Sequence, residues 1–136
     1  MGQQQLILLV LCTIVIGIAI AVGIVMFTSS SLSASRDAML EDMNTIIANS
    51  REYYLRTKSL GGGGNSFDGY YIPARLRGTL NGDYSAAPGS GTGTLVITGK
   101  SVDNELNTIE FDIDGRSKIP APKFGGEFAD EPSASE

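Results

Sequence analysis

The sequence predicts an α+β fold in which a long N-terminal α-helix packs on a small antiparallel β-sheet. Residues 6–27 are almost wholly aliphatic, and apolar residues then recur at spacings of three, four and seven up to Tyr54. That spacing is typical of one buried face of a helix. Segments near 94–114 instead alternate apolar and polar residues, as strands with one wet face do. The predicted helix therefore has an apolar first half and an amphipathic second half.

The chain of 136 residues joins two different chemistries, because no charged residue occurs before Arg36. The net charge of −5 belongs to the remainder, which lacks a basic cluster. An acidic surface of this kind argues against nucleic acid as a partner. The roughly 100 residues that follow the apolar head suffice for one modest domain.

The apolar segment Leu6–Phe27 is long enough to cross a membrane, since as a helix it would span about 33 Å. A cleavable signal peptide would have a basic head and a shorter apolar run. A myristoylation signal would need Ser or Thr where the chain has Leu6. We therefore expect a retained anchor, with Cys12 as a small apolar side chain within it.

No helix stop separates the two halves, because Ser29–Ser35 are small polar residues and no proline precedes Pro73. We expect one continuous helix to about Lys58, roughly 80 Å long. The run Gly61–Gly64 would end it, and a phosphate-binding loop is disfavoured because no Lys-Ser/Thr follows. The predicted divisions are the helix halves 1–28 and 29–60 and a sheet region 61–136. The residues expected on the polar faces of the second half are Arg36, Asp37, Glu41, Asp42, Asn44, Arg51 and Glu52.

The sheet region is predicted to contain strands at Thr94–Lys100 and Asn107–Asp114, joined as a hairpin. A short strand is expected at Phe67–Ile72. Residues 78–93 read as a loop with a tight turn at Asn81-Gly82, and the last seven or so residues as a loose tail. The helix stripe should meet one sheet face through Met39, Met43, Ile46, Ile47, Ile97, Ile109 and Phe111.

Catalytic groups are scarce, because the chain has no histidine and its single cysteine lies in the apolar segment. We expect neither an enzyme nor a cofactor. Glu110-x-Asp112-x-Asp114-Gly115 is similar to the start of a calcium loop, but Ala121 stands where that loop needs a carboxylate. The wet face of a strand explains these acids equally well, so no metal site is predicted.

Small residues form two pairs in the apolar helix, Gly17-xxx-Ala21 and Ala19-xxx-Gly23. This spacing permits close approach of a second helix. The alternative is that glycine is simply frequent in membrane helices.

The segment QQQLILLVLCTIVIGIAIAVGIVMF, followed by the amphipathic stripe and the strands near 94–114, resembles the type IV pilins and pseudopilins. The resemblance covers the whole chain as an architecture and its N-terminal third as a sequence pattern. It implies a structural subunit of an extracellular, cell-surface filament, anchored in the inner membrane before assembly. Its implied partners are identical subunits and the pilus assembly machinery.

Three departures from the family pattern concern the head of the helix. Family precursors have a short, basic leader, which this sequence does not show, so we expect either that Met1 begins the mature chain or that export differs. With Met1 as the first mature residue, Gln5 occupies the position of a family glutamate. An amide there can bond a neighbour's N-terminal amine but cannot neutralise it. The family's helix-breaking proline is absent, which leaves Gly17 and Gly23 as candidates for a loosened stretch. We expect Gln3, Gln4 and Gln5 to form the polar head of the filament core, with their amides paired.

Three other functions remain open at this point. One is a minor pseudopilin of a secretion or uptake machine, which would be built in the same way. Another is a single-pass anchored binding domain that never polymerises and has a flexible juxtamembrane linker. An anchored enzyme is disfavoured by the missing catalytic groups.

Overall fold

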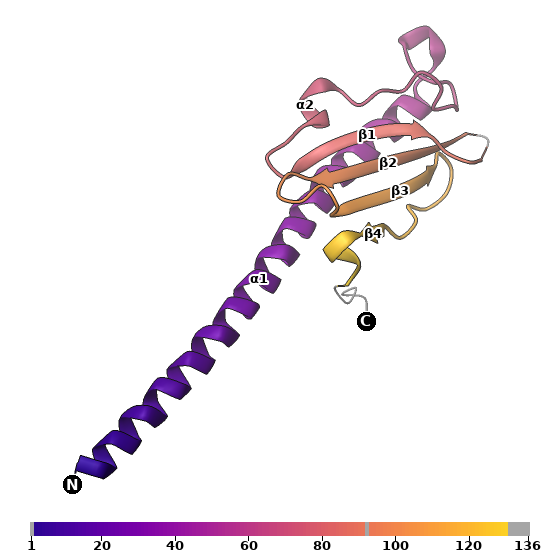
Figure 1. Cartoon of the computed structure of the whole chain (residues 1–136). Coiled ribbons are helices and arrows are strands. Elements are labelled where there is room, and N and C mark those ends of the chain that lie inside the picture. Colours follow the sequence, from indigo (N-terminus) through magenta and orange to yellow (C-terminus); the bar gives the residue numbers. More distant parts are fainter. Residues whose placement is uncertain (1, 92, 131–136) are drawn as a thin grey trace. The chain divides into compact units, whose positions relative to one another are not determined.

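The computed structural model describes residues 2–91 and 93–130 of the chain (Figure 1). One helix, α1, runs from Gly2 to Leu55, which confirms the predicted long N-terminal helix. The chain divides into two compact units, the first ending at Ser33 and the second beginning at Ala34. The second unit holds the sheet, and we call its described part, residues 34–91 and 93–130, the sheet domain.

The predicted stop of α1 at the glycine run is displaced, because the helix ends at Leu55 and a 3-10 turn, η1, follows at Lys58–Leu60. The glycines instead fold back and cap the helix. Gly63 donates its N–H to the Tyr53 carbonyl at 2.8 Å, and Asn65 donates to the Tyr54 carbonyl at 2.8 Å. These bonds satisfy helix carbonyls that would otherwise lack a partner.

The sheet has four antiparallel strands in the order β1-β2-β3-β4. Their bounds are Gly82–Pro88, Thr94–Ser101, Thr108–Asp114 and Lys123–Gly125. Figure 1 shows these strands beside the C-terminal part of α1. A four-residue helix, α2 (Ala74–Arg77), precedes β1, and a 3-10 turn, η2 (Gly126–Ala129), follows β4.

The strands β2 and β3 confirm the two strands and the hairpin that the sequence predicts. The strand predicted at Phe67–Ile72 is wrong, because that segment forms a turn in which Tyr70 donates its N–H to the Phe67 carbonyl at 3.0 Å. Its aromatic rings pack on the helix instead: Phe67 lies 4.9 Å from Tyr54 and Tyr70 lies 5.4 Å from Tyr53, between ring centroids.

The loop predicted over residues 78–93 is wrong as well, since β1 lies within it. Small residues and glycine gave that stretch a weak strand pattern, and pairing with β2 overrides the weak propensity. The predicted turn lies close to its expected place, because Thr79 donates its N–H to the Gly82 carbonyl at 2.9 Å. The short β4 and η2 were not predicted, and the predicted tail falls almost wholly on residues 131–136, outside the described residues.

The core lies between the second half of α1 and one face of the sheet. The helix residues Met39, Met43 and Ile46 are fully buried and Ile47 is 1% exposed. From the sheet, every second residue of β2 and β3 meets them, as expected for a strand with one buried face. The buried sheet residues are Leu95, Ile97, Ile109, Phe111 and Ile113, so the predicted helix–sheet packing is confirmed.

Arg36 departs from its predicted place on a polar helix face, because it is only 7% exposed. Its guanidinium carbon lies 5.5 Å from the ring centroid of Phe124, a cation–π contact, and its Nε lies 3.9 Å from the Asp37 carboxylate. Phe124 belongs to β4, which the sequence pattern does not reveal. The helix face that β4 covers was therefore not predictable.

Asp42 also departs from its predicted polar face, because it joins α1 to the start of the sheet. Its Oδ2 accepts hydrogen bonds from Thr79 Oγ1 at 2.7 Å, Asn81 Nδ2 at 2.9 Å and Tyr84 Oη at 2.9 Å. Partial burial of the Asp42 carboxyl opposes its ionisation, but the three bonds outweigh that effect and hold its pKa below the usual 3.8. The same arrangement, with burial as its main cause, raises the pKa of the Tyr84 hydroxyl.

Replacing Asp42 by Ala is expected to lower the free energy of unfolding by about 2–3 kcal/mol at neutral pH, because three donors lose a charged acceptor. The folded-state pKa of Asp42 is depressed, so its contribution is present above pH 3.8 and is lost as the pH falls through the folded value. Chemical denaturation of the full chain in detergent, followed by near-UV circular dichroism, measures this. The control Glu41→Ala, at an exposed position, should cost less than about 0.5 kcal/mol. If the wild type still had the same excess of unfolding free energy over the Asp42→Ala variant at pH 2, the prediction would be wrong.

Candidate assembly surface

The first unit of the chain presents an apolar surface on every side of the helix. All large hydrophobic side chains from Leu6 to Phe27 are more than half exposed, from 51% at Val22 to 76% at Phe27. By length and composition this stretch of α1 can cross a membrane, and it is therefore compatible with membrane anchoring. A contiguous apolar surface of this extent marks a membrane or protein interaction site.

The polar groups of this segment are satisfied within the helix. Thr13 donates its hydroxyl to the Val10 carbonyl at 2.7 Å, and Thr28 donates to the Ile24 carbonyl at 3.0 Å. The backbone N–H and C=O groups along the segment are paired in the same way by α1. The segment can consequently leave water without losing hydrogen bonds.

The predicted small residues lie on two opposite faces of α1. At about 100° per residue, Gly17 and Ala21 lie about 40° apart, whereas Ala19 and Gly23 lie about 200–240° from Gly17. No atom lies within 4 Å of a Cβ built at Gly17 or at Gly23. Each of the two faces therefore has room for the backbone of another helix.

The predicted glutamines Gln3, Gln4 and Gln5 occupy the first turns of α1 and are all exposed. Successive residues point about 100° apart, so the three amides surround the helix rather than form a stripe. They lie about 18 Å or more along the helix from Gly17. The predicted assembly residues thus do not converge within one chain.

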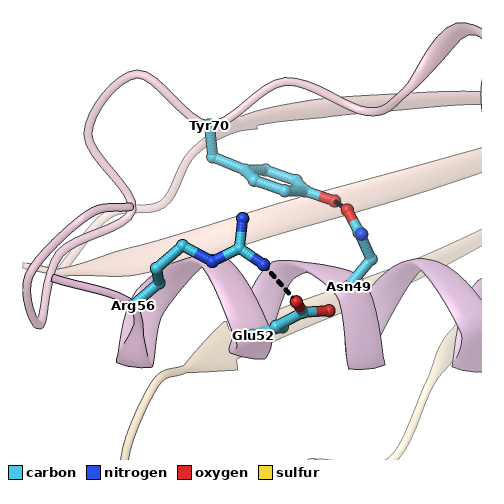
Figure 2. Close-up of polar contacts among 4 residues, drawn as sticks. All are labelled: Asn49, Glu52, Arg56 and Tyr70. Carbon is cyan, nitrogen blue, oxygen red and sulfur yellow. Dashed lines mark hydrogen bonds and ion pairs between the residues drawn. The ribbon is translucent and has the colours of Figure 1, made fainter. Parts of the chain in front are cut away.

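The polar contacts that sequence reasoning missed are in the sheet domain. Figure 2 shows the side chain of Tyr70 reaching across to α1, where its hydroxyl donates to Asn49 Oδ1 at 3.0 Å. The ion pair of Glu52 and Arg56 lies about one turn further along. Burial raises the pKa of Tyr70 to about 12. The aromatic pairs Tyr53-Tyr54 and Tyr70-Tyr71 were the only sequence signal of this contact, which fastens the segment after α1 to the helix.

In the part of the chain that the structure describes, few side chains that could act as acid, base or metal ligand lie near a hollow. A hollow of about 380 Å³ lies between residues 67–70 and the ends of β1 and β2. Its described lining consists mainly of small and apolar residues, and its acid is Asp68. Among residues 2–91 and 93–130, no three His, Cys, Asp or Glu side chains are placed to hold a metal ion.

No known protein family, curated protein or solved structure matches this chain. The candidate site is the exposed apolar half of α1, from Gln3 to Phe27.

Proposed function

We propose that this chain is the structural subunit of an extracellular filament of the type IV pilin kind, assembled through its N-terminal helices. The observation that carries the proposal is the apolar surface of α1, exposed on all sides from Leu6 to Phe27 and continuous with the helix that packs on the sheet. The apolar surface of such a helix must be shielded from water both in the membrane and outside it. Lipid would shield it before assembly, and the helices of other copies would do so afterwards.

The energy of this exchange is large enough to hold a polymer together in water. Full burial of a large aliphatic side chain contributes roughly 1.5–3 kcal/mol, so the segment as a whole supplies on the order of tens of kcal/mol before entropic costs. Inside a bilayer the same side chains gain little from one another, because lipid tails are equally apolar. The subunit would therefore remain dispersed in the membrane and associate strongly once extracted.

The two opposite faces with small residues favour an open polymer over a closed dimer. A helix with one such face fits one neighbour, whereas Gly17/Ala21 and Ala19/Gly23 offer close approach on both sides. Contacts between different faces of identical subunits repeat without closing and generate a helical filament. The glutamine heads would bond to one another or to a neighbour's N-terminal amine, because uncompensated amides are costly once buried.

The proposal places the subunit in the inner membrane before assembly and on the cell surface afterwards. Its partners would be identical copies and the machinery that extracts them from the membrane. It requires no cofactor and no catalytic step, which accords with a sequence that has no histidine.

A second candidate is a minor pseudopilin of a secretion or uptake machine, which would be built in the same way and which abundance on the cell surface would separate from a major subunit. A non-polymerising anchored binding domain fits less well. It would need a flexible linker after the membrane segment, whereas α1 continues without a break through residues 29–35.

Electron microscopy of material sheared from cells that express the chain tests the proposal. We expect filaments that react with antibody against the sheet domain, at an abundance far above that of a minor component. Chain found only as dispersed monomer in the membrane fraction would contradict it, and short, scarce filaments would favour the pseudopilin candidate.

A further inference from the structure

The sheet domain has two distinct ends along α1, which its internal contacts define. At one end, Asn81 bonds to Asp42 and Val102 donates its N–H to the Asn81 carbonyl at 3.4 Å. At the other end, Gly115 lies against the ring of Tyr54, where an added Cβ would clash with the ring. Asp42 and Tyr54 are about 18 Å apart along the helix, so we name these the Asp42 end and the Tyr54 end.

The Asp42 end is acidic. It consists of the β2–β3 connection and η2, which are joined where Asn107 accepts the Glu127 N–H at 2.8 Å. Its basic groups are the buried Arg36, whose Nε lies 3.9 Å from the Asp37 carboxylate, and, at its flank, Arg77 and Lys100, which line a hollow of about 520 Å³ together with Glu105. The exposed acids of this end are Asp37, Glu41, Asp103, Glu105, Glu127 and Asp130.

The Tyr54 end is basic. Arg51 donates to the Ser117 carbonyl at 2.6 Å, which places the β3–β4 connection beside the last turns of α1. The acids of this end are Glu52, Asp114 and Asp68. Glu52 pairs with Arg56, Asp114 accepts bonds from Ser117 Oγ and from the Arg116 N–H, and Asp68 is exposed beside Tyr53, whose hydroxyl donates to the Asp68 carbonyl at 2.7 Å. The exposed cations of this end are Arg56, Lys58, Arg116 and Lys118.

Exposed apolar side chains accompany the charges at both ends. Leu80 is 98% exposed and Leu106 is 75% exposed at the Asp42 end, while Leu60 is 73% exposed and Leu55 is 71% exposed at the Tyr54 end. Protein interfaces combine apolar contacts of this kind with a polar rim. The two ends of one domain are therefore complementary in charge and similar in apolar content.

We infer that the Asp42 end of one sheet domain binds the Tyr54 end of the next copy of this chain. Opposite charges attract across such a contact, whereas contacts between like ends would bring charges of the same sign together. Each Asp42 end is thus occupied by the Tyr54 end of a second copy, and each Tyr54 end by the Asp42 end of a further copy. The contact is head-to-tail and does not close, as a filament requires. This inference rests on the proposed function and adds a second layer of contacts, outside the helix core.

Charge reversal in the full chain tests the inference. Lys58→Glu with Lys118→Glu, or Asp103→Lys with Glu105→Lys, is expected to lower the filament yield at least tenfold. The four substitutions together should restore it, because the attraction is then reversed and not removed. Lys58→Arg with Lys118→Arg keeps the charge of the Tyr54 end and should leave the yield within twofold. If either end pair leaves the yield unchanged, or if the four substitutions do not restore it, the inference is wrong.

Cross-linking separates this inference from the proposed function, because it does not require filaments. In a Cys12→Ser background, Lys58→Cys with Glu105→Cys should form a ladder of disulfide-linked oligomers in concentrated detergent micelles. Either cysteine alone should form few dimers. A ladder without filaments on cells would leave the end contact standing and contradict the filament proposal. Filaments without a ladder, or dimers from single cysteines as abundant as the ladder, would overturn the end contact alone.

Discussion

Replacing Gly17 and Gly23 by Leu together is expected to abolish filament formation while membrane insertion remains intact. Each substitution adds a branched side chain to one of the two opposite faces of α1 where a built Cβ meets no atom within 4 Å. Neighbouring helix backbones would then be held apart, and the packing energy of both contacts would fall. Insertion should survive, because Leu is more favourable than Gly in a bilayer.

The measurement compares the chain in the sheared fraction with the chain in the membrane fraction by immunoblot, with microscopy of the former. We expect the sheared amount to fall more than tenfold at an unchanged membrane amount. Ile18→Leu with Ile20→Leu is the matched control, since these positions are already branched and lie about 100° and 300° from Gly17, between the two small-residue faces. Unchanged filament yield in the glycine variant would remove the small residues from the assembly mechanism.

Replacing Ile97 by Ala is expected to lower the free energy of unfolding of the sheet domain by about 3 kcal/mol. Ile97 is fully buried at the centre of β2, opposite Phe111 on β3 and facing the helix stripe. Truncation removes apolar contacts and leaves a cavity between two elements that cannot close upon each other. A domain of this size has only about 5–15 kcal/mol of stability, so the effect is large.

Denaturation of the full chain in detergent, followed by the near-UV signal of the tyrosines, measures this loss. All five tyrosines lie in the sheet domain, so the signal reports on its packing. Val102→Ala is the matched control, because Val102 is 59% exposed and should change stability by less than about 0.5 kcal/mol. Equal effects at the two positions would contradict the packing of β2 against α1.

The elements with strong periodicity were predictable, and those with weak periodicity were not. Ile109, Phe111 and Ile113 alternate with acids, so β3 could be read directly from the chain. In contrast β1 contains Gly82, Ala86 and Ala87, and it forms because β2 offers a partner along its whole length. The segment with Phe67 and Tyr70 shows the opposite error, a strand predicted where none forms. Its composition is typical of a strand, but it folds as a turn whose aromatic rings pack on the end of α1.

The proposed assembly surface depended little on tertiary structure. The apolar residues, Gly17, Gly23 and the glutamines are defined by their spacing on a single helix, and helical geometry alone places them. Arg36 and Asp42 are the contrary case. Their burial depends on Phe124 and on residues 79–84, which are far away in the sequence.

The order of amino acids was therefore sufficient for the long helix, its two halves, the central hairpin and the face on which they meet. Each of these follows from a local pattern, because side-chain direction repeats every 3.6 residues in a helix and every two in a strand. Only the folded chain revealed the edge strands, the hydrogen bonds to Asp42, and the opposite charges at the two ends of the sheet domain. These features arise where distant segments come together, and no local pattern encodes such a meeting.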